Sequence, residues 1–323
     1  MRAFSYDVAA SPADAVRRVR TTAGAGFIAG GTDLLNLLKD GARDHDLLVD
    51  INRLAMTEVT SSSNTLHLGA LARMSDVAAH PRVQAVAPVV SQALLASASP
   101  QVRNMASLGG NVLQRTRCGY FRDTGSACNK RVPGSGCPAW DGENRGHAVL
   151  GGGPDCIAVH PSDFAVAMVA LDATVVTSAR RIPIRDLHLL PGSTPDRETV
   201  LAHGELITGY EVPITRVAAR SRYLKLRDRA TFEFATVAVA AGLDMAGSVV
   251  RDVRLAFGGV ATKPWRSTGA EAALRGRALT DSTIAAACDA AVAGAAPRAQ
   301  NGFKVELLRN AIGAILRDLA GAR

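Results

Sequence analysis

A long segment between about Leu113 and Cys156 has neither helical nor strand periodicity, and it is the feature that most constrains how this chain can fold. It is rich in Gly, Arg, Pro and Cys, and it holds four of the five cysteines. An unpatterned segment of that length inside a compact domain usually serves a function or is disordered. The patterned segments before and after it must therefore form the fold that carries it.

The cysteines of this segment, Cys118, Cys128, Cys137 and Cys156, are spaced Cys-x9-Cys-x8-Cys-x18-Cys. Disulfides are disfavoured, because a chain of this size needs no covalent staples and shows no secretion signal. Zinc sites usually contain close Cys-x2–4-Cys pairs, which are absent here, whereas a loop wrapped around an iron–sulfur cluster allows wider spacing. Spacing alone leaves a cluster, a zinc site and inert thiols open. Cys288 lies in an alanine-rich helical pattern and is expected to be a small buried side chain.

Two further features of the segment favour a cluster. Glycines would let backbone N–H groups approach the sulfurs, and basic side chains would offset the negative charge of the cluster. The residues concerned are Gly119, Gly134, Gly136, Arg117, Lys130 and Arg131.

The first fifty residues have the order strand, loop, helix, strand. Ser11 is a predicted N-cap for a helix that starts at Pro12. A strand over 26–29 then runs into Gly30-Gly31, Thr32 or Asp33 caps the next helix, and a strand follows over 47–51. Glycines before a helix N-terminus suit a pyrophosphate, although a plain Gly-Gly turn explains the same residues.

A second glycine loop, Ser107 to Asn111, directly precedes the cysteine segment. Ser107 and Asn111 supply polar side chains, and the glycines between them allow a ligand to come close. Asp163 follows the segment. It is either an N-terminal helix residue or an acceptor for a ligand hydroxyl.

The remaining patterns predict an α+β protein of two units, with a boundary near 212–214. Residues 82–98 predict one helix, and the final helix begins near Lys304. Apolar runs over 164–176 and 206–212 predict strands. Two more strands are expected over 234–243 and 249–257, joined through 245–247.

Composition excludes several classes of protein. The chain is 47% hydrophobic and 20% charged, which is typical of a globular fold. The net charge of +8 comes from scattered basic residues, and only 4% of residues are aromatic, which argues against a surface for nucleic-acid bases. No apolar run reaches the roughly 18 residues of a membrane span. The N-terminus lacks the apolar core of a signal peptide, so we expect the cytoplasm, or the periplasm by co-export with a partner that carries the signal.

The motifs Phe27 to Leu34, Ser107 to Asn111 and Pro161 to Asp163 occur in this order, followed by Tyr223 to Arg227. Together they resemble the FAD-binding subunits of the molybdenum hydroxylase family, which includes xanthine dehydrogenase, carbon monoxide dehydrogenase and aldehyde oxidoreductases. In most members only a few residues separate the second and third motifs. Here about 50 intervene. This insertion resembles the one that carries a [4Fe–4S] cluster in the flavin subunits of periplasmic-type aromatic aldehyde oxidoreductases, and the flavin subunit of 4-hydroxybenzoyl-CoA reductase has a comparable one.

The resemblance implies a two-subdomain FAD-binding domain of the PCMH type over 1–215, with the iron–sulfur insertion at about 113–158, and a smaller α+β domain over 216–323. It places the pyrophosphate at the first motif, the flavin or its phosphates at the second, a cofactor hydroxyl at Asp163, the adenine side near Ile207 and the flavin region near Lys225. The implied FAD residues are Phe27, Ile28, Ala29, Gly30, Gly31, Thr32, Asp33, Leu34, Ser107, Gly110, Asn111, Asp163, Ile207 and Lys225. The implied cluster ligands are Cys118, Cys128, Cys137 and Cys156.

The function implied is that of an electron-transfer subunit without acid–base catalysis of its own. Electrons would pass from a large molybdenum-cofactor subunit, through a small [2Fe–2S] subunit, to FAD in this chain and on to an external acceptor. Three alternatives stay open: the flavin subunit of a related xanthine, carbon monoxide or 4-hydroxybenzoyl-CoA complex, a flavin-containing oxidoreductase that acts on its own, and a zinc-stapled binding module whose glycine loops are only turns.

Overall fold

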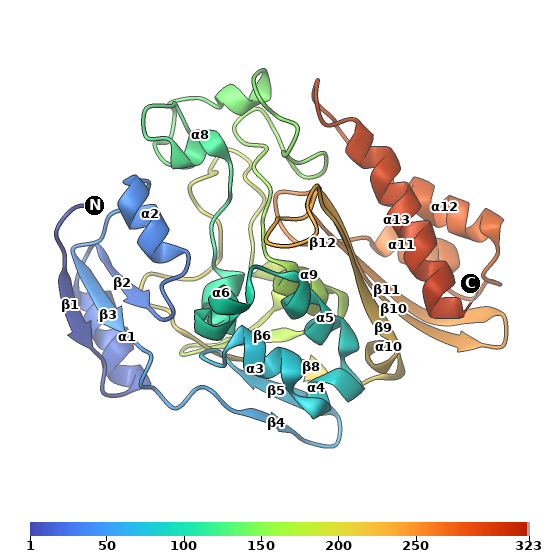
Figure 1. Ribbon diagram of the computed structural model, residues 1–323, viewed down its shortest axis with the longest axis horizontal. Helices are drawn as coiled ribbons and strands as arrows, with labels where there is room; N and C mark the ends of the chain where they lie inside the picture. Colours follow the sequence, from blue (N-terminus) through green and yellow to red (C-terminus); the bar gives the residue numbers. More distant parts are fainter. Residues whose placement is uncertain (322–323) are drawn as a thin grey trace.

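The computed structural model describes residues 1–321 and contains three sheets (Figure 1). The strands are β1 (Ser5–Val8), β2 (Ala25–Ile28), β3 (Leu47–Asp50), β4 (Val59–Ser61), β5 (Thr65–Gly69), β6 (Thr174–Thr177), β7 (Arg181–Pro183), β8 (Ile207–Pro213), β9 (Ser221–Leu226), β10 (Val237–Ala246), β11 (Val249–Gly258) and β12 (Trp265–Arg266). The α-helices are α1 (Pro12–Thr21), α2 (Leu34–Asp40), α3 (Met74–Ala79), α4 (Pro81–Val86), α5 (Pro88–Ala96), α6 (Pro100–Met105), α7 (Leu108–Val112), α8 (Gly119–Arg122), α9 (Asp163–Ala170), α10 (Arg216–Ala219), α11 (Thr268–Leu274), α12 (Asp281–Val292) and α13 (Phe303–Ala320). Short 3-10 turns lie at Pro138–Trp140 and Ile184–Asp186.

The N-terminal part is a parallel sheet in the order β1-β3-β2, with α1 and α2 in its connections. The Ser11 hydroxyl accepts the N–H of Asp14 and caps α1, as predicted. Strands β2 and β3 and the helix between them are also confirmed. Asp33 precedes α2, but its side chain makes no capping bond.

The middle part is a five-stranded sheet in the order β4-β5-β8-β6-β7, packed with α3, α5 and α9 around one core. The single helix predicted over 82–98 is wrong, because Pro88 cannot supply the N–H that would continue it; the chain breaks at Ala87 into α4 and α5. The strand predicted at 164–176 is wrong over its first half, which forms α9 and is buried on all sides. A continuous apolar run carries no periodicity, so it fits a buried helix as well as a strand.

The C-terminal part is an antiparallel sheet in the order β12-β11-β10-β9, and both of its faces are covered. Along β10, Val237, Val239, Ala241 and Leu243 pack with α11, α12 and α13, whereas Ala240 belongs to the core of the middle part. The sheet therefore joins two cores. Its two long strands and the final helix were predicted, and the α+β class is confirmed.

The cysteine segment leaves the end of α7 and returns at α9, and in Figure 1 it arches over the top of the molecule between α2 and α13. It holds only α8 and one 3-10 turn, in agreement with its lack of periodicity. No helix within residues 1–321 is long and apolar enough to cross a membrane. The division at 215/216 and the insertion bounds of about 113–158 stay predictions.

Candidate functional site

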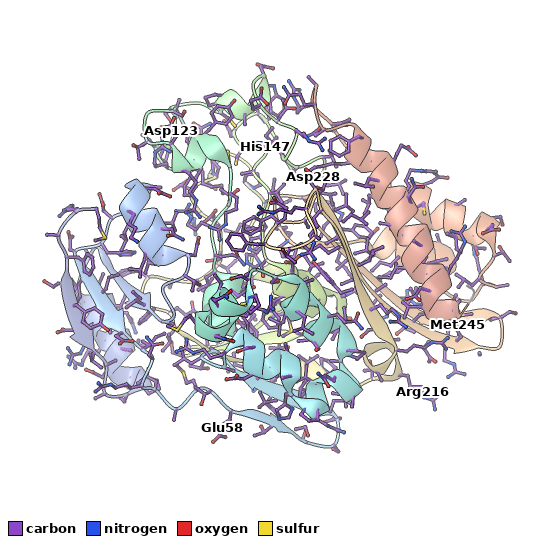
Figure 2. The ribbon with its side chains drawn as sticks, viewed as in Figure 1. Glu58, Asp123, His147, Arg216, Asp228 and Met245 are labelled. Carbon is purple, nitrogen blue, oxygen red and sulfur yellow. The ribbon has the colours of Figure 1, made fainter. Side chains whose placement is uncertain are left out.

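A cavity of about 330 Å³ lies where the cysteine segment, the start of α9 and the loop before β10 meet. Its lining includes Arg117, Cys118, His147, Asp163 and Phe234. Its size is within the range of about 300–1,000 Å³ that small ligands occupy. His147, from the cysteine segment, and Asp228, from the loop between β9 and β10, both line this cavity and are labelled in Figure 2. We call it the central cavity.

Asp163 is a polar residue of the central cavity. It is the first residue of α9, as expected from the alternative in which it is an N-terminal helix residue. Its carboxylate accepts hydrogen bonds from Tyr223 Oη at 2.6 Å and Ser97 Oγ at 2.8 Å, and it pairs with Lys225 Nζ at 2.8 Å. Both charged side chains are at most 5% exposed, so the pair is fully desolvated. Burial and the neighbouring carboxylate raise the pKa of Tyr223 well above its usual value, so its hydroxyl stays a donor.

This arrangement changes the expected role of Lys225. Its ammonium is balanced by Asp163 and also donates to the Ala96 carbonyl at 3.1 Å. Lys225 is not among the side chains that line the central cavity. The structure thus brings the predicted Asp163 and Lys225 together, but as one buried pair. Ser97 was missed, because nothing in its sequence context marks it.

The first glycine loop lies between β2 and α2 and packs on the end of α6. A Cβ on Gly30 would come within 2.0 Å of the Met105 carbonyl oxygen, so no larger residue fits. Gly31 has φ +69°, a left-handed conformation that favours glycine. The Asn52 amide also donates to the Ala29 carbonyl at 3.0 Å and fixes the start of this loop.

Asp33, at the end of the same loop, faces the cysteine segment. It accepts the backbone N–H of Arg115 at 2.8 Å and pairs with the guanidinium groups of Arg117 and Arg122, the latter at 2.8 Å. Burial alone would raise the pKa of Asp33, but these positive partners lower it below its usual value. Asp33 therefore joins the predicted pyrophosphate loop to the start of the cysteine segment.

The second glycine loop and the Ser162-Asp163 turn lie side by side. Ser107 caps α7 by accepting the N–H of Gly110 at 3.2 Å. The Asn111 side-chain oxygen accepts the Ser162 hydroxyl at 2.6 Å. The two ends of the cysteine segment are thereby held together across about 50 residues of chain. Ile207 lies elsewhere, in the core of the middle part on β8.

A second, smaller cavity lies inside the cysteine segment, and all four of its cysteines line it. The side chains of Cys118, Cys128, Cys137 and Cys156 come from four separate turns. Burial raises the pKa of Cys118 to about 11, and it also raises the pKa values of Cys137 and Cys156. All of them are free thiols. We call this the cysteine cavity.

The cysteine cavity and the central cavity share two lining side chains, Cys118 and His147. His147 Nε2 lies 3.2 Å from Cys118 Sγ, while His147 Nδ1 is buried without a hydrogen-bond partner. Burial, and to a lesser degree the positive charge of Lys304, lowers the pKa of His147 to about 4. No sequence pattern singles out His147, since it stands outside every motif.

Of the predicted counter-charges, Lys130 lines the cysteine cavity, where its positive charge partly offsets the rise in the pKa of Cys156, whereas Arg117 and Arg131 are engaged elsewhere. Arg117 pairs with Asp33, Lys130 pairs with Glu198 at 3.0 Å, and Arg131 donates to backbone carbonyls that include that of Phe121 at 2.7 Å. The glycine N–H groups do not approach the sulfurs as expected either: that of Gly136 donates to an asparagine side chain. The backbone donors near sulfur come instead from residues such as Ala158, 3.4 Å from Cys156 Sγ.

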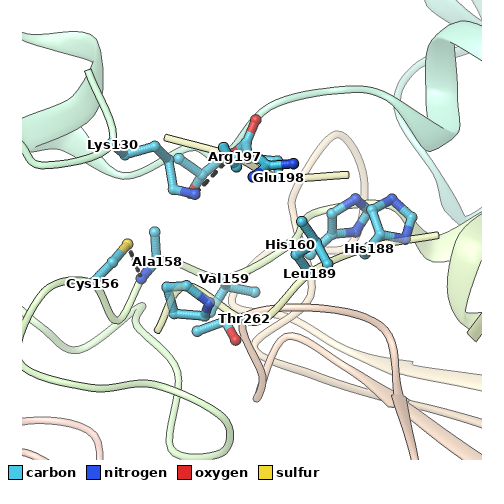
Figure 3. A pocket seen from close by; sticks show the side chains of 12 residues that line it. Lys130, Cys156, Ala158, Val159, His160, His188, Leu189, Arg197, Glu198 and Thr262 are labelled. Carbon is cyan, nitrogen blue, oxygen red and sulfur yellow. Dashed lines mark hydrogen bonds and ion pairs between the residues drawn. The ribbon is translucent and has the colours of Figure 1, made fainter. Parts of the chain in front are cut away.

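Figure 3 shows a third cavity, of about 20 Å³, compared with about 10 Å³ for the cysteine cavity; Cys156 lines both. Glu198 there pairs with Lys130 and Arg115, and these two cations lower its pKa although burial alone would raise it. His160 and His188 stack edge to face, and both ring Nε2 atoms approach the Val112 carbonyl. This buried network holds the underside of the cysteine segment.

No three His, Cys, Asp or Glu side chains within residues 1–321 converge closely enough to bind one metal ion. The four cysteines thus surround a space without meeting at a point. Their arrangement does not resemble a preformed mononuclear site, in which four sulfurs would each lie about 2.3 Å from one zinc ion.

Two family models cover nearly all of the chain. Residues 2–215 match the FAD binding domain in molybdopterin dehydrogenase, and residues 221–319 match the CO dehydrogenase flavoprotein C-terminal domain. The aldehyde oxidoreductase FAD-binding subunit PaoB of Escherichia coli (strain K12) is 44% identical over 98% of both chains. The glyceraldehyde dehydrogenase medium chain of Sulfolobus acidocaldarius is 27% identical over 87% of this chain and 84% of its own.

Solved structures agree with this assignment. A carbon monoxide dehydrogenase chain from Hydrogenophaga pseudoflava superposes with a TM-score of 0.77 at 25% identity, over 99% of this chain and 98% of that one. Sequence similarity and fold therefore both support the assignment of this chain to an oxidoreductase family. This chain belongs to the FAD-binding subunits of the molybdenum hydroxylases.

Proposed function

We propose that this chain is the FAD- and [4Fe–4S]-containing electron-transfer subunit of a heterotrimeric molybdenum aldehyde oxidoreductase. The observation that carries the proposal is the pair of adjoining cavities: one is lined by four cysteines, the other borders Asp163, and Cys118 and His147 line both. A cluster in the first cavity would lie next to a flavin in the second.

The residues of the FAD site suit a dinucleotide. Gly31 adopts a left-handed turn just before α2, so the loop can bring backbone N–H groups close to a phosphate, while Gly30 lets the loop pack on the Met105 carbonyl. Asp163 offers a carboxylate at the central cavity. FAD, when bound, exchanges electrons singly with clusters and in pairs with an acceptor.

The cysteine cavity suits a cluster better than zinc. A four-iron cluster is held by four thiolates, and four cysteines without a close Cys-x2–4-Cys pair line this cavity, which matches the number and type of ligands. In the absence of a metal, burial keeps the Cys118 thiol protonated, with its pKa at about 11. Bound iron would supply the positive charge that stabilises buried thiolates.

The protein's own contribution is to position the two groups and to exclude water. Asp163, whose charge is balanced by the buried Lys225 behind it, gives the central cavity a fixed polar group. Asn111 and Ser162 hold the two ends of the insertion together, and Asp33 holds its start against the first glycine loop. These contacts set the separation of the two cavities.

The aldehyde substrate and the partners are inferred from relatives. PaoB is named as a subunit of an aldehyde oxidoreductase, and the Sulfolobus acidocaldarius relative is the medium chain of a glyceraldehyde dehydrogenase. We propose a large molybdenum subunit and a small [2Fe–2S] subunit as partners, together with an external electron acceptor. We place the complex in the cytoplasm, or in the periplasm by co-export with a partner. Co-expression with genes for the two partners, followed by assays of the purified complex with a panel of aldehydes and acceptors, tests this.

The cluster is tested by substitution. Cys128→Ser removes one proposed ligand and should remove about four irons per chain while FAD remains bound. The matched control is Cys288→Ser, since Cys288 is buried in α12, away from the cysteine cavity, and its thiol donates to the Arg309 carbonyl at 3.3 Å. Equal iron contents in both variants would refute the assignment.

A further inference from the structure

We propose that His147 is a positioning residue for Cys118: its ring donates the Nε2 hydrogen to the Cys118 sulfur and thereby raises the reduction potential of the cluster. This inference rests on the cluster proposed above. It assigns a role to a residue outside every motif of the sequence, at the one place where the two cavities meet.

The geometry supports a fixed donor. His147 Nε2 lies 3.2 Å from Cys118 Sγ, and the residue is 9% exposed. Its backbone is held by the C-terminal part of the molecule, since its carbonyl accepts from Lys304 Nζ at 3.0 Å and from Asn301 Nδ2 at 3.3 Å. The backbone that carries the ring is therefore fixed by α13 and the turn before it, next to Cys118.

The position of the hydrogen follows from the partners. A neutral imidazole carries one N–H, and a thiolate can only accept. Nδ1 has no partner within residues 1–321, so Cys118 is the one group that selects a tautomer. A buried polar atom without a partner is uncommon in a folded protein. It is accounted for here if the sulfur holds the hydrogen on Nε2.

The consequence is specific to one ligand. Reduction adds negative charge to a cluster, and a hydrogen bond to a ligand sulfur stabilises that charge, so it raises the potential. Cys118 is the only one of the four cysteines among the side chains that line the central cavity. His147 thus acts on the ligand that faces the proposed flavin site.

The test uses the purified complex. His147→Leu removes the donor, whereas His147→Gln keeps an N–H near the Nε2 position. We expect the leucine variant to retain iron and FAD. In a redox titration followed by EPR, the equilibrium constant for reduction of its cluster should be about tenfold smaller, so that its reduction potential is about 59 mV lower for one electron. The glutamine variant should stay close to the unaltered protein. His45→Leu is the control, since His45 is equally buried but lies outside both cavities.

A second measurement detects the hydrogen directly. Electron–nuclear double resonance of the reduced cluster in D₂O should show exchangeable deuterons that couple to it, and His147→Leu should remove the one from the ring while those of backbone donors such as Ala158 remain. Iron retained in His147→Leu with an unchanged potential and an unchanged deuteron signal would overturn the role of His147 alone. Purified unaltered protein without iron would overturn the cluster proposal, and with it this inference.

Discussion

A buried pair of charged residues contributes to the stability of this chain. Asp163 and Lys225 are both almost fully removed from water, and each satisfies the other. Removing one partner of such a pair leaves an uncompensated charge in a low dielectric, which costs more than the pair itself contributes. Exposed ion pairs, such as Arg2 with Asp46, lack this penalty.

Lys225→Met should lower the free energy of unfolding by roughly 3–5 kcal/mol, because Asp163 is then buried without a cation. Arg2→Met, at a pair whose side chains are 63% and 56% exposed, should cost less than about 1 kcal/mol. Urea unfolding followed by circular dichroism measures both. Similar losses in the two variants would show that the Asp163 pair is not desolvated in solution.

His188 predicts a pH dependence. Burial lowers its pKa to about 4, below the ordinary value of 6.5, so between these values the unfolded chain binds the proton and the folded chain does not. Stability from this group is present above pH 6.5 and is lost as the pH falls toward 4. At pH 5.5, one pH unit below the pKa of the unfolded chain, the free energy of unfolding should be about 1.4 kcal/mol lower because of this group.

His188→Gln should remove that part of the pH dependence. Urea unfolding of the two proteins between pH 5.5 and 7.5 measures it, and the unaltered protein should have the steeper decline on the acid side. Parallel curves would mean that His188 takes up its proton equally well in the folded chain.

At the scale of elements, the glycine loop between β2 and α2 depends on a close approach of two backbones. A Cβ at Gly30 would overlap the Met105 carbonyl, which is fixed at the end of α6. The loop must then move away from α6, and with it the groups expected to hold the pyrophosphate.

Gly30→Ala should therefore reduce the FAD retained per chain, whereas Gly153→Ala, with open space around its Cβ position, should not. The flavin absorbance released on denaturation, divided by protein concentration, gives the result. A fully loaded Gly30→Ala protein would show that this loop does not contact FAD.

The elements that the sequence predicted well are those with a clear period or cap. Ser11 with Pro12 marked α1, and the heptad-like stripe from Leu308 to Leu319 marked α13. The run at 164–176 failed because α9 is apolar on every side, so its sequence has no period to read. Pro88 was the missed signal that divides α4 from α5.

The site divides in the same way. Glycine loops and cysteines could be found from the sequence, because their residue types are special wherever they stand. Ser97, His147 and Glu198 could not be found, since an ordinary serine, histidine or glutamate acquires its role only from the tertiary contact it makes. Asp33 was found, and its side chain turned out to face arginines of the cysteine segment.

At the scale of the whole molecule, the cysteine segment is held from three sides. Asp33 holds its start, Glu198 holds Lys130 near its middle, and the chain before α13 holds its later part, where Asn144 and Gln300 exchange two hydrogen bonds of 3.0 Å. Lys304 adds bonds to the carbonyls of 146 and 147. The segment is thus a product of the complete fold, which explains how it stays ordered without helices or strands of its own.

Asp33→Asn should lower both iron and FAD content, because one side chain joins the two sites. Asp40→Asn is the matched control, since Asp40 contacts Arg122 only at 3.5 Å and is partly exposed. Iron and flavin analysis of both purified variants measures the effect. Loss of FAD with full retention of iron would show that the segment does not depend on Asp33.

The central claim is that one chain holds FAD and a four-iron cluster in adjoining cavities. The most direct test is the flavin, iron and zinc content of the purified complex, with the EPR spectrum recorded after reduction by an aldehyde. The account predicts about one FAD and about four irons per chain, and a reduced-cluster signal. Zinc in place of iron, or no flavin released on denaturation, would contradict it.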